Sequence, residues 1–126
     1  MKERNILYKE LSYKIVGTFY EFYNTLGPGY KEIVYHKTLA IEFGLRGLKF
    51  EEKKKLEISY KGHKVGIYEP DFVIENKIIV EIKAVPEILK VYEKQLYYYL
   101  IGTNYQLGYL VNFGAEKLDI RRRIYT

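Results

Sequence analysis

One apolar segment, residues 78–84 (IIVEIKA), constrains the fold of this chain more than any other. Side chains of a strand alternate between its two faces, so the three leading apolar residues make both faces apolar. We therefore expect residues 77–84 to form a central strand of a sheet. Glu81 and Lys83 then share one face, and we expect helix packing on the other. Burying a carboxylate and an ammonium there costs free energy unless they are paired or bind a metal.

The rest of the chain follows helical and extended patterns. Apolar residues recur every three to four positions in the N-terminal part, which predicts two amphipathic helices that end at Gly27 and Gly47. Pro86 opens a third helix, because proline at the first helical position loses no hydrogen bond. The expected elements are helices at 3–26, 30–46 and 86–101 and strands at 53–60, 64–74, 77–84, 105–113 and 118–125.

This order predicts a single α/β domain over residues 1–126, because no linker, repeat or low-complexity tract divides the chain. The three strands before the third helix should form an antiparallel meander. The third helix is long enough to serve as a crossover, so the strands on either side of it could pair in parallel and make the sheet mixed.

Composition restricts the metals that the chain could hold. The absence of cysteine excludes disulfides, zinc-thiolate sites and a cysteine nucleophile. The two histidines, His36 and His63, fall in different expected elements, which excludes a zinc site of several histidines. Carboxylates remain, and these suit hard cations such as Mg²⁺, Mn²⁺ or Ca²⁺.

Charge and hydropathy indicate which partners and which cellular compartment to expect. A net charge of +5 over 126 residues favours polyanionic partners, because lysine and arginine neutralise phosphates. No apolar run approaches the roughly 18 residues of a membrane-spanning helix, and the N-terminus does not resemble a signal peptide. We expect a cytoplasmic protein without a membrane partner.

Asp71 joins Glu81 and Lys83 only under one condition. If Glu75-Asn76-Lys77 forms a three-residue loop, Asp71 lies directly opposite Glu81, with Cβ atoms roughly 5 Å apart. Two carboxylates that close repel each other unless a cation lies between them. A two-residue loop would set Asp71 against Val80, on the wrong face. The alternative for the three charges is a surface ion pair on an exposed sheet, which contributes about 0 to 1 kcal/mol.

Several motifs occur in the same order as in a known protein family. The segment 29–35 (GYKEIVY) follows a Leu-Gly-Pro-Gly turn, 68–85 contains the charged residues above, Gln95 lies on the third helix, and 110–114 reads LVNFG. Over residues 10–123 the chain resembles the PD-(D/E)XK nuclease superfamily, and within it the GxxExxY family. The resemblance implies a restriction-endonuclease-like core of helix, three-strand meander, helix and strand, with an extra N-terminal helix and a C-terminal strand.

The resemblance also implies roles for individual residues. Asp71, Glu81 and the backbone carbonyl of Ile82 would bind Mg²⁺ or Mn²⁺. Lys83 would act on the attacking water and stabilise the transition state, and Glu32 would complete the metal or water shell. On the third helix, Gln95 could orient Lys83 or touch the substrate, and Tyr99 is a candidate substrate contact or a core tyrosine. Tyr92 stands where family members often carry histidine, so a function of that histidine cannot be transferred.

The implied activity is metal-dependent hydrolysis of phosphodiester bonds in DNA, with RNA as the second choice of substrate. The alternative is a nuclease-fold module that binds nucleic acid or a protein partner without cutting. A small nuclease of this kind could also form a homodimer. Glu21, His36, His63 and the runs 53–55 (KKK) and 121–123 (RRR) are interpreted mainly as solvated helix, turn and strand residues.

Overall fold

The computed structural model of the chain describes residues 7–126, and the start of the expected first helix, residues 3–6, lies outside the described residues. The described elements are α1 (Lys9–Leu26), α2 (Glu32–Leu45), β1 (Phe50–Glu52), β2 (Leu56–Tyr60), β3 (His63–Tyr68), β4 (Phe72–Ile74), β5 (Ile78–Lys83), α3 (Lys90–Thr103), β6 (Leu107–Asn112) and β7 (Asp119–Ile124). None of these helices is long and apolar enough to cross a membrane.

The main sheet has the strand order β1-β4-β5-β6-β7. β5 therefore lies in the middle, as its apolar residues predicted. It pairs in parallel with β6, across the α3 crossover, while the other pairs are antiparallel. The expectation of a mixed α/β sheet with a central strand over residues 77–84 is confirmed.

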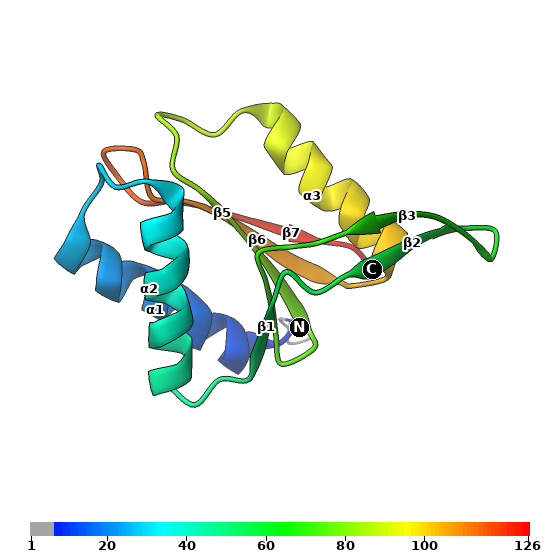
Figure 1. Cartoon of the computed structure of the whole chain (residues 1–126), viewed down its shortest axis with the longest axis horizontal. Coiled ribbons are helices and arrows are strands. Elements are labelled where there is room, and N and C mark those ends of the chain that lie inside the picture. Colours follow the sequence, from blue (N-terminus) through cyan, green and yellow to red (C-terminus); the bar gives the residue numbers. More distant parts are fainter. Residues whose placement is uncertain (1–6) are drawn as a thin grey trace, which may run out of the picture.

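Helices cover both faces of this sheet, with α1 and α2 on one side and α3 on the other (Figure 1). Ile78, Val80 and Ile82 face the α1 and α2 side, in a cluster that includes Phe19 and Phe43. Ile79 of β5 faces α3 instead and packs in the second cluster with Leu96, Leu100 and Leu110. The face of β5 opposite Glu81 and Lys83 is covered by helices, as the sequence indicated. The face that carries Glu81 and Lys83 is also covered, by α3.

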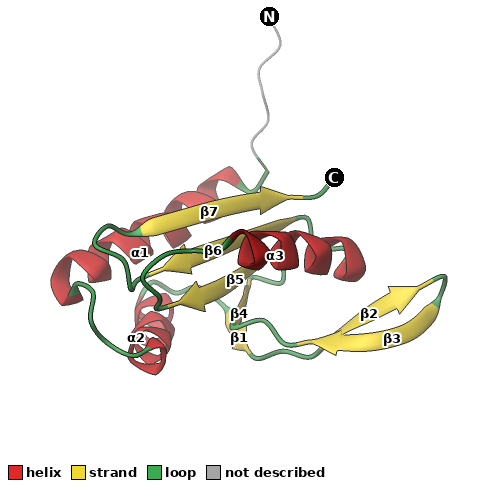
Figure 2. Cartoon of the chain, turned by 90° about the horizontal axis from the view of Figure 1, so that it is seen from above, coloured by secondary structure: helices red, strands yellow, loops and turns green. Residues whose placement is uncertain are grey.

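The expected meander is built from other strands than predicted. The segment expected as one strand, 64–74, divides into β3 and β4, because Pro70 between them has a fixed φ and no N–H for a strand ladder. β2 and β3 form a separate two-stranded hairpin, which extends beyond the main sheet in Figure 2. The core meander is β1-β4-β5, in which Phe50 pairs with Ile74. β1 was missed because three residues are too few to show alternation.

The third helix also begins later than expected, at Lys90 rather than Pro86. The side chain of Asn112 at the end of β6 accepts a hydrogen bond from the Val85 N–H at 3.0 Å and donates one to the Val85 carbonyl at 2.8 Å. These bonds hold the chain after β5 beside the end of β6, so the helix starts only after this segment has crossed over the sheet.

Candidate active site

The register of β4 and β5 decides whether Asp71 meets Glu81. Ile74 pairs with Ile78 and Phe72 with Val80, so the three-residue loop at residues 75–77 is confirmed. The next position in this register places Asp71 opposite Glu81. The Lys77 N–H donates to the Ile74 carbonyl at 2.9 Å and closes the loop.

Asp71 lies just before β4 and is 6% exposed. Its backbone N–H donates to Oε1 of Glu81 at 3.1 Å, and its own Oδ2 accepts a hydrogen bond from the Ile82 N–H at 2.7 Å. Carboxylate oxygens thus replace backbone carbonyls as acceptors just before β4, where its ladder with β5 ends at the Phe72–Val80 pair. These bonds hold the two carboxylates next to each other at the carboxyl end of β5.

Two tyrosines support Glu81 from the α3 side. The Tyr68 hydroxyl donates to Oε2 of Glu81 at 2.5 Å. The Tyr68 ring stacks on Tyr99 of α3, with centroids 3.8 Å apart and planes 11° from parallel. Burial, and then the negative charge of Asp71, raise the pKa of Glu81 to about 7. Burial and the neighbouring Glu81 carboxylate also raise the pKa of Tyr68, so this hydroxyl remains a donor.

Lys53 supplies a positive charge that was not assigned to the site from sequence. Its ammonium donates to Oδ1 of Asp71 at 2.7 Å. The hydrogen bond to Asp71 raises the pKa of Lys53. Glu52 of β1 pairs with Phe72 of β4, which brings the next residue, Lys53, beside Asp71. A lysine run expected to be solvated therefore contributes one member to the site, through a strand that the sequence did not reveal.

His36 is the second residue that was not assigned to the site. Its Nε2 lies 2.8 Å from Oε1 of Glu52, and its Nδ1 lies 4.0 Å from Oδ1 of Asp71. The imidazole stacks on the Phe72 ring with centroids 4.4 Å apart. His36 follows Glu32 by four residues, so both lie on one face of α2. This spacing was the available signal that both residues face the carboxylates.

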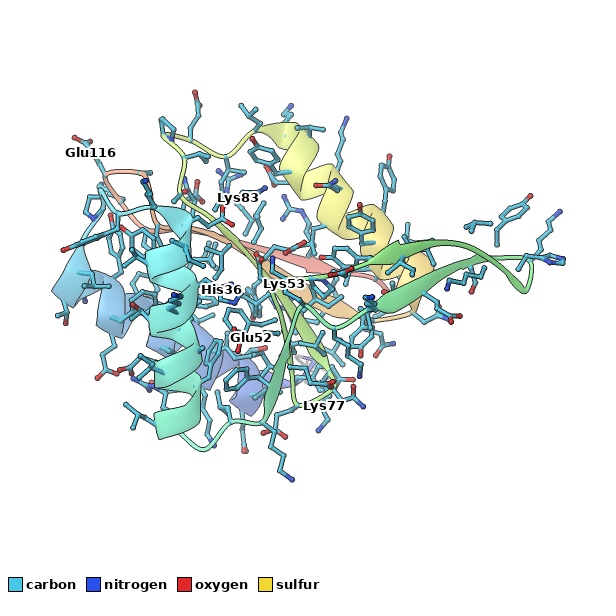
Figure 3. All side chains as sticks on the ribbon, viewed as in Figure 1. His36, Glu52, Lys53, Lys77, Lys83 and Glu116 are labelled. Carbon is cyan, nitrogen blue, oxygen red and sulfur yellow. The ribbon has the colours of Figure 1, made fainter. Side chains whose placement is uncertain are left out.

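Glu32 of α2 and Lys83 of β5 are the two other charged residues predicted for the site. Partial desolvation, and then the charge of Asp71, raise the pKa of Glu32, while Lys83, Lys53 and His36 lower it. The Lys83 ammonium lies 4.3 Å from the centroid of the Tyr92 ring, in a cation–π contact with the first turn of α3. Figure 3 shows Lys83, Lys53 and His36 between α2 and α3.

The family model of the PD-(D/E)XK nuclease superfamily matches residues 9–123. The chain belongs to this superfamily. No curated protein matches it. The crystal structure of a protein named SSO0001 has a similar fold, with a TM-score of 0.54 and 22% sequence identity. That match covers 72% of this chain and 48% of the other, so this chain spans about half the length of SSO0001.

The other residues predicted for this PD-(D/E)XK protein lie on or beside α3. Gln95 is exposed on α3, one turn after Tyr92. Tyr99 is partly buried and packs in the α3-side cluster, and its ring reaches the carboxylates through Tyr68. Away from the site, Glu21 of α1 pairs with Arg46, and His63 is exposed at the start of β3.

The donor atoms fit a hard divalent cation that keeps several water ligands. Within residues 7–126 no group of three or more histidine, aspartate or glutamate side chains converges. Two carboxylates, Asp71 and Glu81, are enough for Mg²⁺, which usually retains waters and takes one or two protein carboxylates. In an extended strand the N–H and C=O of one residue point to the same side, so the Ile82 carbonyl points toward Asp71, as its N–H does. A carboxylate oxygen can accept a second bond, so these hydrogen bonds do not exclude a metal.

Proposed function

We propose that this PD-(D/E)XK protein hydrolyses phosphodiester bonds of nucleic acid, preferring DNA to RNA, with bound Mg²⁺ or Mn²⁺. One observation carries the proposal. Asp71, just before β4, lies opposite Glu81 of the central strand β5, and Glu81 precedes Lys83 by two residues on the same face of that strand. Holding a buried Asp71 next to a half-buried Glu81 is costly, of the two Lys53 pairs only with Asp71, and a metal-binding role accounts for the remaining cost. We also place the chain in the GxxExxY family, on its motif at residues 29–35, and in the cytoplasm.

In this proposal Asp71, Glu81 and the Ile82 carbonyl hold the cation. Bound there, a divalent cation polarises a phosphoryl oxygen and lowers the pKa of a coordinated water. The Lys83 ammonium positions the attacking water and stabilises the negative charge that develops on the phosphoryl oxygens. Tyr92 limits the directions in which Lys83 can point, because their cation–π contact orients the ammonium.

Glu32 is assigned to the water. Partial burial and the charge of Asp71 raise its pKa, which makes it a better proton acceptor than an ordinary glutamate. Gln95, exposed on α3, is assigned to the substrate backbone beside Lys83. Tyr99 is assigned to positioning, because it stacks on Tyr68, whose hydroxyl holds Glu81. Direct contact of Tyr99 with substrate stays a prediction.

The test is a cleavage assay with labelled duplex, single-stranded, flapped and branched DNA and RNA. We expect cleavage with Mg²⁺ or Mn²⁺, no cleavage with EDTA, and a loss of at least about a hundredfold in Asp71→Ala and Lys83→Ala. Circular dichroism checks that both variants fold. Lys64→Ala, exposed on the β2–β3 hairpin, is the matched control and should retain activity.

Two outcomes would contradict the proposal. Cleavage that persists in both site variants would come from a contaminant. Calorimetry that detects no Mn²⁺ site, together with salt-dependent nucleic-acid binding, would favour the module that binds without cutting. A Mn²⁺ site that disappears in Glu81→Gln supports the metal ligands independently of turnover.

A further inference from the structure

A second surface, separate from the candidate active site, lies on the outer side of α3. A groove of about 490 Å³ is formed there by α3 and β7. Its lining residues are Lys90, Glu93, Lys94, Tyr97, Tyr98 and Arg123. None of them is assigned to the candidate active site.

The groove exposes two neighbouring aromatic rings. Tyr98 is 64% exposed and Tyr97 is 37% exposed, and their ring centroids are 6.3 Å apart. Tyr125 holds the Tyr97 ring edge-to-face, at a centroid distance of 6.3 Å and an angle of 84°. Rings of this kind, open to solvent, can stack on the bases of a nucleic acid.

The charge around these rings is positive. Lys90 and Lys94 are exposed on α3, one turn apart. The one acidic lining residue, Glu93, is compensated twice, because its carboxylate pairs with Arg121 at 2.8 Å and with Arg123. The two lysines therefore remain available to phosphates.

We propose that this groove binds an unpaired stretch of nucleic acid, with bases stacked on Tyr97 and Tyr98 and phosphates against Lys90 and Lys94. Bases within a duplex are covered by neighbouring base pairs, so these rings can stack only on unpaired bases. The groove begins at Lys90, in the first turn of α3, and this turn also carries Tyr92, which contacts Lys83 from another face of the helix. As a substrate site the groove rests on the proposed function, but its occupancy is measurable without cleavage.

The test measures fluorescence anisotropy in EDTA, with a labelled oligothymidylate of about 15 nucleotides and a duplex of the same length. The single strand should bind more tightly. Tyr98→Ala should weaken its binding at least about fivefold, whereas Tyr98→Phe keeps the ring and the affinity. Lys94→Gln should reduce the slope of log affinity against log salt by about 0.7, the value for one lost phosphate contact on a single strand.

Matched controls lie on α1, on the opposite side of the sheet. Tyr20 is 48% exposed and Lys14 is exposed. Tyr20→Ala and Lys14→Gln should leave both the affinity and the salt slope unchanged. A drop in affinity equal to that of the groove variants would overturn the proposal, because binding would then follow total charge and aromatic content.

Three further results would overturn it: unchanged affinity in Tyr98→Ala and Lys94→Gln, preference for the duplex, or a dimer in light scattering that Tyr98→Ala dissociates. The last would identify a second copy of the chain as the occupant. If the chain binds single strands through the groove but cleaves nothing with Mg²⁺ or Mn²⁺, the groove stands and the nuclease proposal fails. If the chain cleaves while Tyr98→Ala binds normally, the nuclease stands and the groove proposal fails.

Discussion

The ammonium of Lys53 lies 2.7 Å from Oδ1 of Asp71, the carboxylate that faces Glu81. Asp71 is almost fully buried, whereas the Lys53 side chain is 56% exposed. An exposed surface cation therefore neutralises part of the charge of the two carboxylates. The divalent cation that we propose needs the same oxygens, so it would compete with Lys53 for Asp71.

We therefore predict that Lys53→Met binds Mn²⁺ about three- to tenfold more tightly than the wild-type chain. The variant removes both a competitor for Oδ1 and a positive charge that repels the metal. Calorimetric titration at fixed pH measures the change. Lys55→Met, two residues away and exposed, is the control and should bind Mn²⁺ normally. Weaker binding in Lys53→Met would show that this lysine supports the metal site.

Because of Glu81, we predict an unusual dependence of the free energy of unfolding on pH when no metal is bound. Its pKa rises from an ordinary 4.5 to about 7 in the folded chain, because burial and Asp71 disfavour its charged form. Between these pH values the folded chain keeps a proton that the unfolded chain loses. The free energy of unfolding should then fall as pH rises from about 5 to 7, by up to about 2 to 3 kcal/mol.

Urea denaturation in EDTA at several pH values measures this fall, which should be absent in Glu81→Gln. Metal binding should show the opposite trend, because the proton must leave before the metal binds. Affinity for Mn²⁺ should rise up to about tenfold per pH unit below 7 and level off above it. A free energy of unfolding that does not change with pH, in the wild-type chain as in Glu81→Gln, would refute the raised pKa of Glu81.

Tyr68→Phe should shift the pH dependence of Mn²⁺ binding to higher pH. The hydroxyl of Tyr68 stabilises the charged form of Glu81, so its loss raises the pKa of that carboxyl further. Stability above pH 7 should also fall, by about 1 to 3 kcal/mol, because a buried carboxylate loses a donor. Tyr99→Phe keeps the ring that stacks on Tyr68 and should leave the pH profile unchanged. An unshifted profile in Tyr68→Phe would contradict the role of this hydroxyl.

Gly114→Ala should destabilise the chain and disturb the site indirectly. A Cβ at residue 114 would lie 2.5 Å from the carbonyl carbon of Ala84 and also against the Val85 nitrogen, directly after Lys83. We expect a loss of about 1 to 3 kcal/mol in denaturant unfolding, and weaker cleavage. Gly17→Ala, with nothing within 4 Å of the added Cβ on α1, should instead be neutral or stabilise by up to about 1 kcal/mol. Equal stability of both variants would contradict this packing.

Much of the scaffold could be predicted from local patterns. α1 and α2 are marked by a recurrence of apolar residues every three to four positions, and β5 by its apolar run. The loop at residues 75–77 placed Asp71 opposite Glu81. Other boundaries were wrong where distant groups act on the backbone. The start of α3 depends on Asn112, which holds Val85 from another strand.

The amino-acid sequence by itself determined the central strand, the conditional meeting of Asp71 with Glu81, and the identity of Lys83 as their neighbour. Only the tertiary structure decided which groups complete the site. Lys53 reaches Asp71 through the pairing of β1 with β4, and Tyr68 reaches Glu81 at the base of the β2–β3 hairpin. The physical reason is that a three-residue strand has no detectable period of its own, so its partner is selected by burial and hydrogen bonding across the whole sheet.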